Sequence, residues 1–230
     1  MKLNRLRILS SIFILSVSTS VYTADSDIYL TQTGTGLTLA IDQVGASNKI
    51  GTSQARVILS GTSMTVDLDQ LGDTNVLAAS ISQGNSSSWT YKVTGDSSNA
   101  TFAVGGTGDV AGSDFDFEAT GDSTVLVFNQ GDAATSTSGD QDFVVTGASN
   151  NINVKCNVIG CKNSWTVSGN SNDIDTLQSG ANDHEIVVSL TGSSNNVDVD
   201  QTDTANTNVL NLISTTSNAT IDVDQCASGC

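Results

Sequence analysis

The chain has 230 residues, with 21 glycines, no proline and only 5% aromatic side chains, and this length is enough for one or two domains. The formal net charge of −16 at pH 7 argues against nucleic acid and anionic membranes as partners. His184 is the only histidine, so the chain has few side chains suited to acid–base catalysis at neutral pH.

The first predicted element is a secretory signal peptide over residues 1–24. Lys2, Arg5 and Arg7 form a basic start, residues 8–17 are a short apolar run, and small residues follow. The apolar run is too short to favour an uncleaved membrane anchor.

Cleavage after Ala24 is expected, with cleavage after Ser20 as the alternative because Tyr22 is an imperfect residue two places before Ala24. All 24 acidic residues lie after Ala24 and three of the 8 basic residues lie before it, so the mature chain carries a net charge of −19. We expect a secreted protein, extracellular or at the cell surface, with no membrane span after cleavage.

Residues 25–230 are predicted to form one repeat domain built from short β-strands. Apolar and polar residues alternate in runs that end in Gly, Asn, Asp or Ser, which is the pattern of strands joined by turns. The expected strands are 27–32, 37–43, 64–70, 89–95, 100–106, 114–121, 125–131, 151–158, 185–192, 196–201 and 219–225.

Turn glycines recur about every 11 residues, for example from Gly34 to Gly45, which favours a solenoid or a sandwich. Extra Gly, Ser and Thr over 105–121 and 131–141 predict loops. We therefore expect irregular rungs over about 105–165.

One polar motif recurs at the strand ends. In "QVGASNKIGTSQ", Gln43 is followed by Gly45, Asn48 and Gln54. An unpaired buried amide costs about 1–3 kcal/mol, and an equivalent amide one rung away, at about 4.8 Å, would pair with it. The motif predicts inward-facing amide ladders, with glycine allowing a turn at positive φ and asparagine tolerating a left-handed corner. The predicted turn glycines are Gly34, Gly45, Gly72 and Gly180.

The pattern S-x5-Q-x-G-x2-N-x5-Q resembles the repeat of the curlin family, the subunits of bacterial curli fibres. The match is good over residues 26–54 and loose between about 85 and 165. The resemblance implies an all-β solenoid of stacked strand–turn–strand rungs with two parallel sheets, and it implies self-association into fibres. It also implies these ladder positions: Gln32, Gln43, Asn48, Gln54, Gln70, Asn75, Asn172, Gln178, Asn195, Gln201 and Asn206.

Four cysteines, Cys156, Cys161, Cys226 and Cys230, are expected to form structural disulfides in an exported chain. Local pairing within "CNVIGC" and within "CASGC" is the simplest arrangement, although four cysteines allow three connectivities. Metal ligation is disfavoured because the spacings lack the paired arrangement of zinc ribbons.

Alternating acids such as Asp67/Asp69, Asp198/Asp200 and Asp222/Asp224 share one strand face. A solvated acidic face that limits edge-to-edge stacking is the expected role, and calcium bridging is the alternative. No cofactor is expected beyond that weak possibility of calcium. Trp89, Trp165, Tyr29 and Tyr91 are expected to pack structurally, although strand parity alone does not say which of them face inward.

The sequence predicts an exported, non-enzymatic structural protein that assembles by end-to-end strand stacking as a fibre subunit or a surface or matrix component. The first alternative is a non-polymerising adhesin or virion appendage rod that binds a glycan or a surface. An ice- or calcium-binding solenoid and a polysaccharide-active β-helix enzyme are further alternatives, and His184 cannot be assigned to a catalytic triad by spacing.

Overall fold

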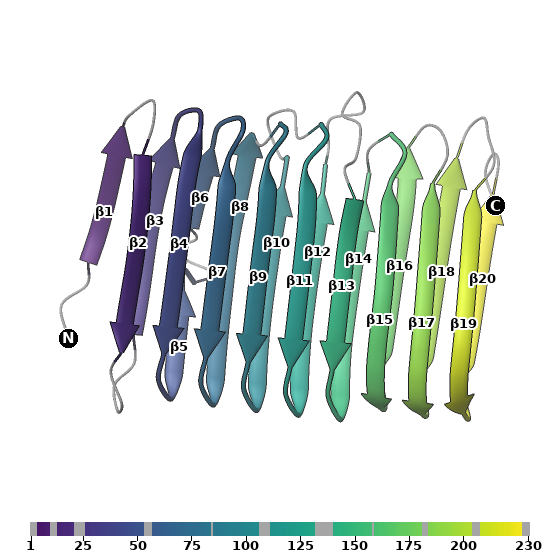
Figure 1. Ribbon diagram of the computed structural model, residues 1–230. Coiled ribbons are helices and arrows are strands. Elements are labelled where there is room, and N and C mark those ends of the chain that lie inside the picture. Colours follow the sequence, from purple (N-terminus) through teal and green to yellow (C-terminus); the bar gives the residue numbers. More distant parts are fainter. Residues whose placement is uncertain are drawn as a thin grey trace.

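The alternating sequence folds into an all-β solenoid in which two parallel sheets face each other, as predicted (Figure 1). The structure is a computed structural model. It describes residues 4–9, 13–20, 26–52, 57–83, 85–105, 111–131, 140–157, 159–180, 184–203 and 208–226.

One sheet, which we call sheet A, has 11 strands. In spatial order they are β1 (Asn4–Leu9), β3 (Ser26–Thr33), β5 (Ser47–Ile50) with β6 (Val57–Ser60), β8 (Thr74–Gln83), β10 (Ser97–Val104), β12 (Ser123–Gln130), β14 (Ser149–Cys156), β16 (Asp173–Gly180), β18 (Asn196–Asp203) and β20 (Thr220–Cys226). Strands β5 and β6 occupy one level together, because each pairs with β3 on one side and β8 on the other.

The opposite sheet, sheet B, has 9 strands. They are β2 (Phe13–Ser20), β4 (Leu37–Val44), β7 (Thr65–Leu71), β9 (Ser88–Thr94), β11 (Asp114–Thr120), β13 (Asp140–Thr146), β15 (Lys162–Asn170), β17 (Glu185–Ser193) and β19 (Val209–Ser217). The chain alternates between the sheets, so each turn adds one level to both.

Alternation places one face of most described strands in the core. In β11 the burial alternates residue by residue, with Phe115, Phe117 and Ala119 buried between exposed polar neighbours. Fully burying a large apolar side chain contributes about 1.5–3 kcal/mol, and such side chains fill the space between the sheets along the rod. Core burial therefore fixes which face of each strand points inward.

The middle of the rod is more regular than the sequence suggested. Strands β10 to β15 pair residue for residue with their neighbours, and no register shift is recorded between them. In the region expected to have irregular rungs, about 105–165, the described strands are therefore regularly paired. Residues 114–120 form β11, which confirms the strand predicted over 114–121 and corrects the loop predicted over 105–121 at these residues, whereas 106–110 and 132–139 lie outside the described residues.

Several strands lie outside the runs that were given as examples of the sequence pattern. They are β5, β6, β8, β13, β15, β16 and β19. Residues of the predicted signal peptide form β1 and β2, which continue the two sheets beyond β3 and β4. Cleavage of the peptide remains a prediction, and after it β3 and β4 would be the first strands.

None of the described residues belongs to a helix of the length and hydropathy needed to cross a bilayer.

Candidate functional site

The predicted amides of Gln43 and Gln70 stack on each other inside the rod. Nε2 of Gln70 donates to Oε1 of Gln43 at 2.8 Å, and both side chains are buried. Near the other end, Nε2 of Gln201 donates to Oε1 of Gln178 at 2.9 Å. The hydroxyl of Tyr91 also donates to Oε1 of Gln70, so a tyrosine on the next rung continues the hydrogen bonds of the amide pair.

Asparagines form a second ladder along the corner where sheet B turns into sheet A. Nδ2 of Asn48 donates to Oδ1 of Asn75 at 3.2 Å, and Nδ2 of Asn172 donates to Oδ1 of Asn195 at 3.0 Å. Each ladder bond joins neighbouring rungs, so it forms only when the rungs are stacked in register.

The same amides hold the corner in place, which explains the spacing of glycine and asparagine in the motif. Nδ2 of Asn75 donates to the carbonyl of Gly72, three residues earlier, at 2.9 Å, and Asn172 does the same to Gly169 at 3.0 Å. Asn48 lies in a strand and was expected to tolerate a left-handed corner; instead it turns its side chain back to the carbonyl of Gly45.

The corner glycines are required mainly by close stacking. A Cβ on Gly72 would strike the carbonyl oxygen of Gly45 on the previous rung, and a Cβ on Gly95 would strike that of Gly72. Gly72 does not adopt a left-handed φ, so the predicted reason for a glycine there was wrong. Gly34 does have a positive φ of 149°, and Gly180 ends β16 beside Asp203.

The remaining predicted ladder positions differ from the pairs above. Gln32 is buried, but its neighbour in register on β6 is Leu59, and its Nε2 donates to the carbonyl of Thr33 at 3.3 Å. Gln54 and Asn206 lie outside the described residues.

The motif search missed several inward amides. Asn150 donates to Asn172 at 2.7 Å, Gln225 donates to Gln201, and Gln141 donates to Gln130. Asn150 follows Gly147 by three residues, so the glycine–asparagine half of the motif alone would have found it. The strand containing Gln225 repeats the text around Gln201, "VDVDQ" against "IDVDQ".

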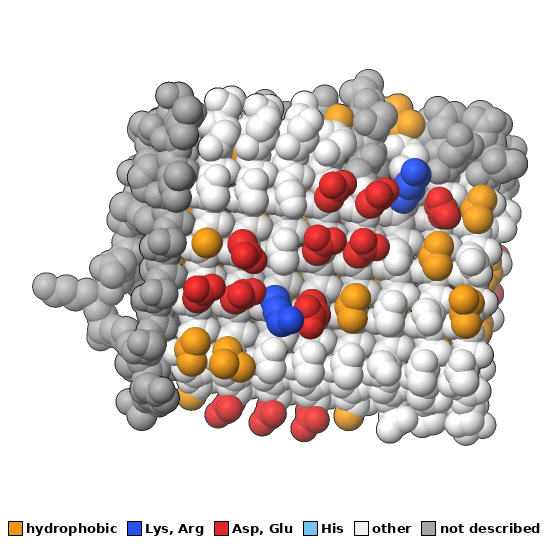
Figure 2. Space-filling view, viewed as in Figure 1, with side chains coloured by type: hydrophobic (Ala, Val, Ile, Leu, Met, Phe, Trp, Pro, Cys, Tyr) orange, Lys and Arg blue, Asp and Glu red, His pale blue; other side chains and the backbone are white. Residues whose placement is uncertain are grey.

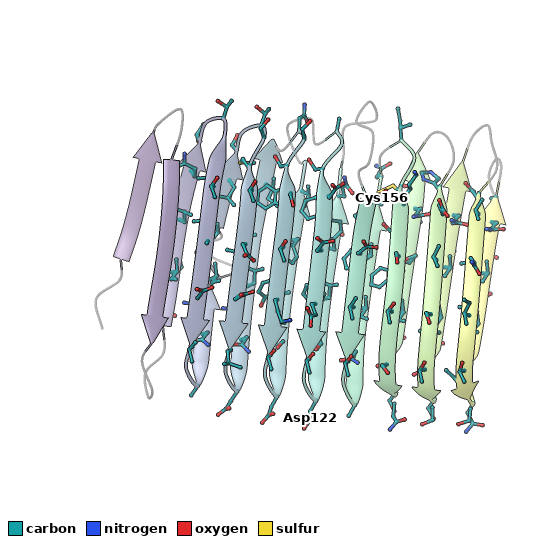
Figure 3. All side chains as sticks on the ribbon, viewed as in Figure 1. Asp122 and Cys156 are labelled. Atoms are coloured by element: carbon teal, nitrogen blue, oxygen red, sulfur yellow. A yellow bond between two sulfur atoms is a disulfide. The ribbon has the colours of Figure 1, made fainter. Side chains whose placement is uncertain are left out.

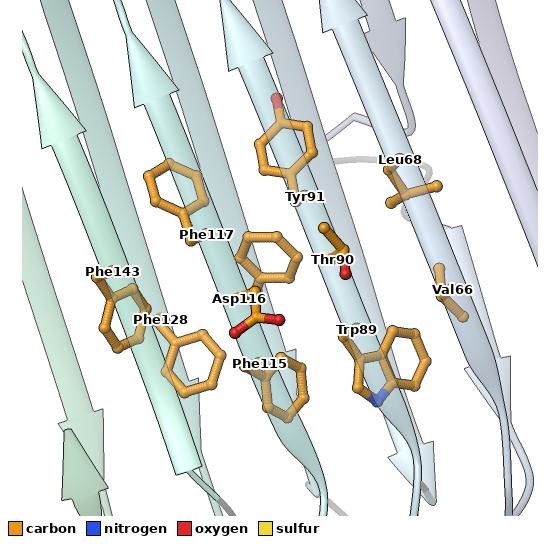
Figure 4. A pocket seen from close by; sticks show the side chains of 11 residues that line it. Val66, Leu68, Trp89, Thr90, Tyr91, Phe115, Asp116, Phe117, Phe128 and Phe143 are labelled. Atoms are coloured by element: carbon orange, nitrogen blue, oxygen red, sulfur yellow. The ribbon is translucent and has the colours of Figure 1, made fainter. Parts of the chain in front are cut away.

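Aromatic side chains fill the core in the middle of the rod, where Trp89 and Tyr91 continue the inward rows of Val66 and Leu68. Figure 4 shows rings between the sheets, where Trp89 stacks on Phe115 with 5.8 Å between ring centroids. Phe143 also stacks on Trp165, with 4.1 Å between ring centroids. The cavity among the rings in Figure 4 holds only about 10 Å³ of water-accessible space, which is too small for an organic ligand. Trp89, Tyr91 and Trp165 therefore pack the core, whereas Tyr29 is only partly buried.

A disulfide joins Cys156 at the end of β14 to Cys161 before β15, as the simplest predicted pairing had it (Figure 3). Cys226 is also disulfide-bonded, and Cys230 lies outside the described residues. The labelled Asp122 marks the opposite end of the rungs, at the turn before β12.

His184 is fully buried next to this disulfide. Its Nδ1 accepts the backbone N–H of Cys161 at 3.1 Å. This hydrogen bond links the His184 side chain to the backbone of the preceding rung, so His184 has a structural role.

The outer face of sheet B carries rows of carboxylates (Figure 2). A groove there is lined by Asp67, Asp69, Asp116, Glu118 and Asp142 around Lys92, and Nζ of Lys92 lies 2.8 Å from Oε2 of Glu118. Partial burial, followed by the charges of Asp67 and Asp42, raises the pKa of Asp69. Within the described residues, no group of three or more His, Cys, Asp or Glu side chains is arranged to hold a metal ion.

The outer face of sheet A carries a second acidic row at its C-terminal end. Asp198 lies in register with Asp222, and Asp200 with Asp224. Desolvation and then the charges of Asp200, Asp175 and the β20 acids raise the pKa of Asp198. These like charges are stacked at the spacing of neighbouring strands, about 4.8 Å, so they repel each other.

Within the described residues, the rod ends in an open edge at β19 and β20. Among the described strands, β19 and β20 have a neighbour on one side only, and their inward side chains are less covered than those of earlier rungs. Ile221 is 38% exposed, whereas Val197 at the same place on β18 is 0% exposed. Leu210, Leu212 and Val223 are only partly buried.

Comparisons with known proteins found no match among family models, curated proteins or solved structures.

Proposed function

We propose that the chain is an exported, non-enzymatic structural protein that associates end to end into fibres, as a fibre subunit or a surface or matrix component. The observation that carries this proposal is the open end at β19 and β20, where apolar inward side chains and the unpaired edges of two strands meet solvent. An open strand edge is a template for pairing with another chain.

Two sequence features support the proposal. The repeat resembles that of curlin, whose subunits form fibres, and a signal peptide is predicted at residues 1–24. The amide ladders add specificity, because a second copy must stack in register to continue them and an amide left unpaired costs about 1–3 kcal/mol.

The alternative is a non-polymerising rod, an adhesin or a virion appendage, that binds a glycan or a surface. The net charge of −19 on the chain without the signal peptide favours it, since like charge on every copy opposes association.

The test uses purified chain 25–230, followed over time by thioflavin fluorescence and electron microscopy. Unbranched fibres that diffract with a spacing of about 4.7–4.8 Å along their axis support end-to-end stacking. A folded, strand-rich protein that stays monomeric at high concentration and moderate salt would exclude a fibre subunit and favour the rod.

A further inference from the structure

The two sheets do not end at the same level. Sheet A runs through ten levels, from β1 to β20, and sheet B through nine, from β2 to β19. A chain that starts at β3 therefore begins and ends in sheet A. If β3 of a second copy were placed on β20, one level of sheet B would stay empty between β19 and β4 of that copy.

Strand β3 carries the inward pattern that β18 meets in β20. Strand β20 places Ile221, Val223 and Gln225 against Val197, Val199 and Gln201. The corresponding residues of β3 are Ile28, Leu30 and Gln32, since the sheet A register leads from one set to the other. The apolar contacts and the terminal amide are therefore available from either strand.

The outward residues favour β3. In β20, Asp222 and Asp224 face Asp198 and Asp200 of β18, and Asp175 of β16 adds a further carboxylate beside Asp198.

The nearest cation in these rows is Lys155 on β14, and Leu177 separates it from Asp200. Strand β3 would instead place Tyr29 beside Asp198 and Thr31 beside Asp200, and it would remove the like-charge contacts. Desolvation, then the charges of Asp200 and Asp175, and last those of Asp222 and Asp224 raise the pKa of Asp198, so the β20 acids add to this shift.

A buried amide also lacks its partner when β20 is in place. Nδ2 of Asn195 has no hydrogen-bond partner within the described part of the chain, although Asn195 is only 1% exposed. Earlier asparagines donate to the next rung, but the next residue in register after Asn195 is Ala219. At this place β3 has Ser26, and a serine hydroxyl can accept the N–H.

We propose that β20 is an exchangeable cap: during assembly, β3 of a second copy replaces β20 on the edge of β18, and β4 of that copy stacks on β19. This inference rests on the proposed end-to-end assembly and specifies its joint. Exchange leaves no empty level in either sheet. Following the sheet B register, Leu39 of the incoming β4 meets Leu210, and Ile41 meets Leu212.

Cysteine cross-linking between two differently labelled copies tests the joint. After exchange, residue 31 of the incoming copy lies beside residue 200, whereas plain stacking on β20 would place it beside residue 224. We would mix chain 25–230 carrying T31C with chains carrying D200C or D224C, let them assemble, oxidise them mildly and identify the disulfides by mass spectrometry. A103C, in the same row on β10, is the control away from the ends.

The expected result is fibres with a T31C–D200C cross-link and at most background cross-linking to D224C and A103C. Fibres cross-linked through T31C–D224C would overturn cap exchange and leave fibre assembly standing. Fibres without either cross-link would also overturn it. A chain that forms no fibres would refute the proposed function together with its joint.

Removal of acidic charge from β20 gives a second test. Cap exchange predicts slower fibre elongation, whereas general charge repulsion between copies predicts faster elongation. Substitution D222N/D224N makes β20 a better cap, so seeded elongation should slow by about tenfold, on the scale expected for two cross-strand charge pairs. The control D67N/D69N removes the same charge from sheet B and should leave elongation unchanged or faster. Equal acceleration by both double substitutions would overturn cap exchange.

Discussion

Substitution of Gly95 by alanine tests the stacking of the corner glycines. A Cβ at this position would overlap the carbonyl oxygen of Gly72 and lie 2.6 Å from Nδ2 of Asn75. Both atoms are already engaged, because Nδ2 of Asn75 donates to the Gly72 carbonyl at 2.9 Å. The obstacle is largely backbone, so the rungs must separate locally to admit a methyl group.

The expected cost of Gly95→Ala is about 2–4 kcal/mol in the free energy of unfolding. About 1–3 kcal/mol of this is overpacking, and about 1 kcal/mol is the weakened hydrogen bond of the corner. For a chain of this size, Tm should fall by about 4–16 °C, at about 2–4 °C per kcal/mol. Thermal unfolding followed by circular dichroism measures the shift.

Gly36 provides the matched control. Its φ is +69°, and a Cβ there would have nothing within 4 Å. Gly36→Ala should cost only about 1 kcal/mol through backbone strain, and Gly36→Asn should cost less, because asparagine tolerates this conformation. Equal Tm values for Gly95→Ala and the wild type would refute the argument that stacking, rather than φ, selects these glycines.

Three further outcomes are expected. Gln70→Leu should lower the free energy of unfolding by about 2–4 kcal/mol, because it leaves the buried polar groups of Gln43 and Tyr91 unpaired. Adding Tyr91→Phe should recover part of this loss, because it removes one of the unpaired groups. If chemical denaturation shows that the two substitutions destabilise additively, the hydrogen bond between Tyr91 and Gln70 would be contradicted. The raised pKa of Asp198 means that the folded chain binds its proton more tightly than the unfolded chain. This stabilisation is complete below the unfolded pKa of about 3.9 and is lost as the pH rises through the higher folded value. Asp198→Asn should therefore raise Tm at pH 7 and leave it unchanged at pH 3, and a Tm gain of the same size at both pH values would disprove this reasoning. Replacing Cys156 and Cys161 by serine should cost about 2 kcal/mol, as expected for a short closed loop, and an unchanged denaturation midpoint would show that the disulfide does not stabilise the fold.

The polar motif was sufficient to predict the amide pairs near the two ends of the rod. Gln43 and Gln70, and Gln178 and Gln201, carry the signal because an inward amide is chemically unlike its apolar neighbours. The motif was silent in the middle, where Val93 and Ala119 continue the row of Gln43 and Gln70, and there the repeat was harder to see in the sequence although the strands stay regularly paired.

Local chemistry in the sequence determined the strands, the turn positions and the inward amides, because alternation, glycine and asparagine act over a few residues. Only the tertiary structure decided which residues are neighbours across rungs. Gln43 pairs with Gln70 across 27 residues, whereas Asn150 pairs with Asn172 across 22, since connecting segments of different length restore the same register. The true reason for Gly72, the inward direction of Trp89 and the unequal ends of the two sheets all depend on that stacking. No single repeat contains the contacts that produce them.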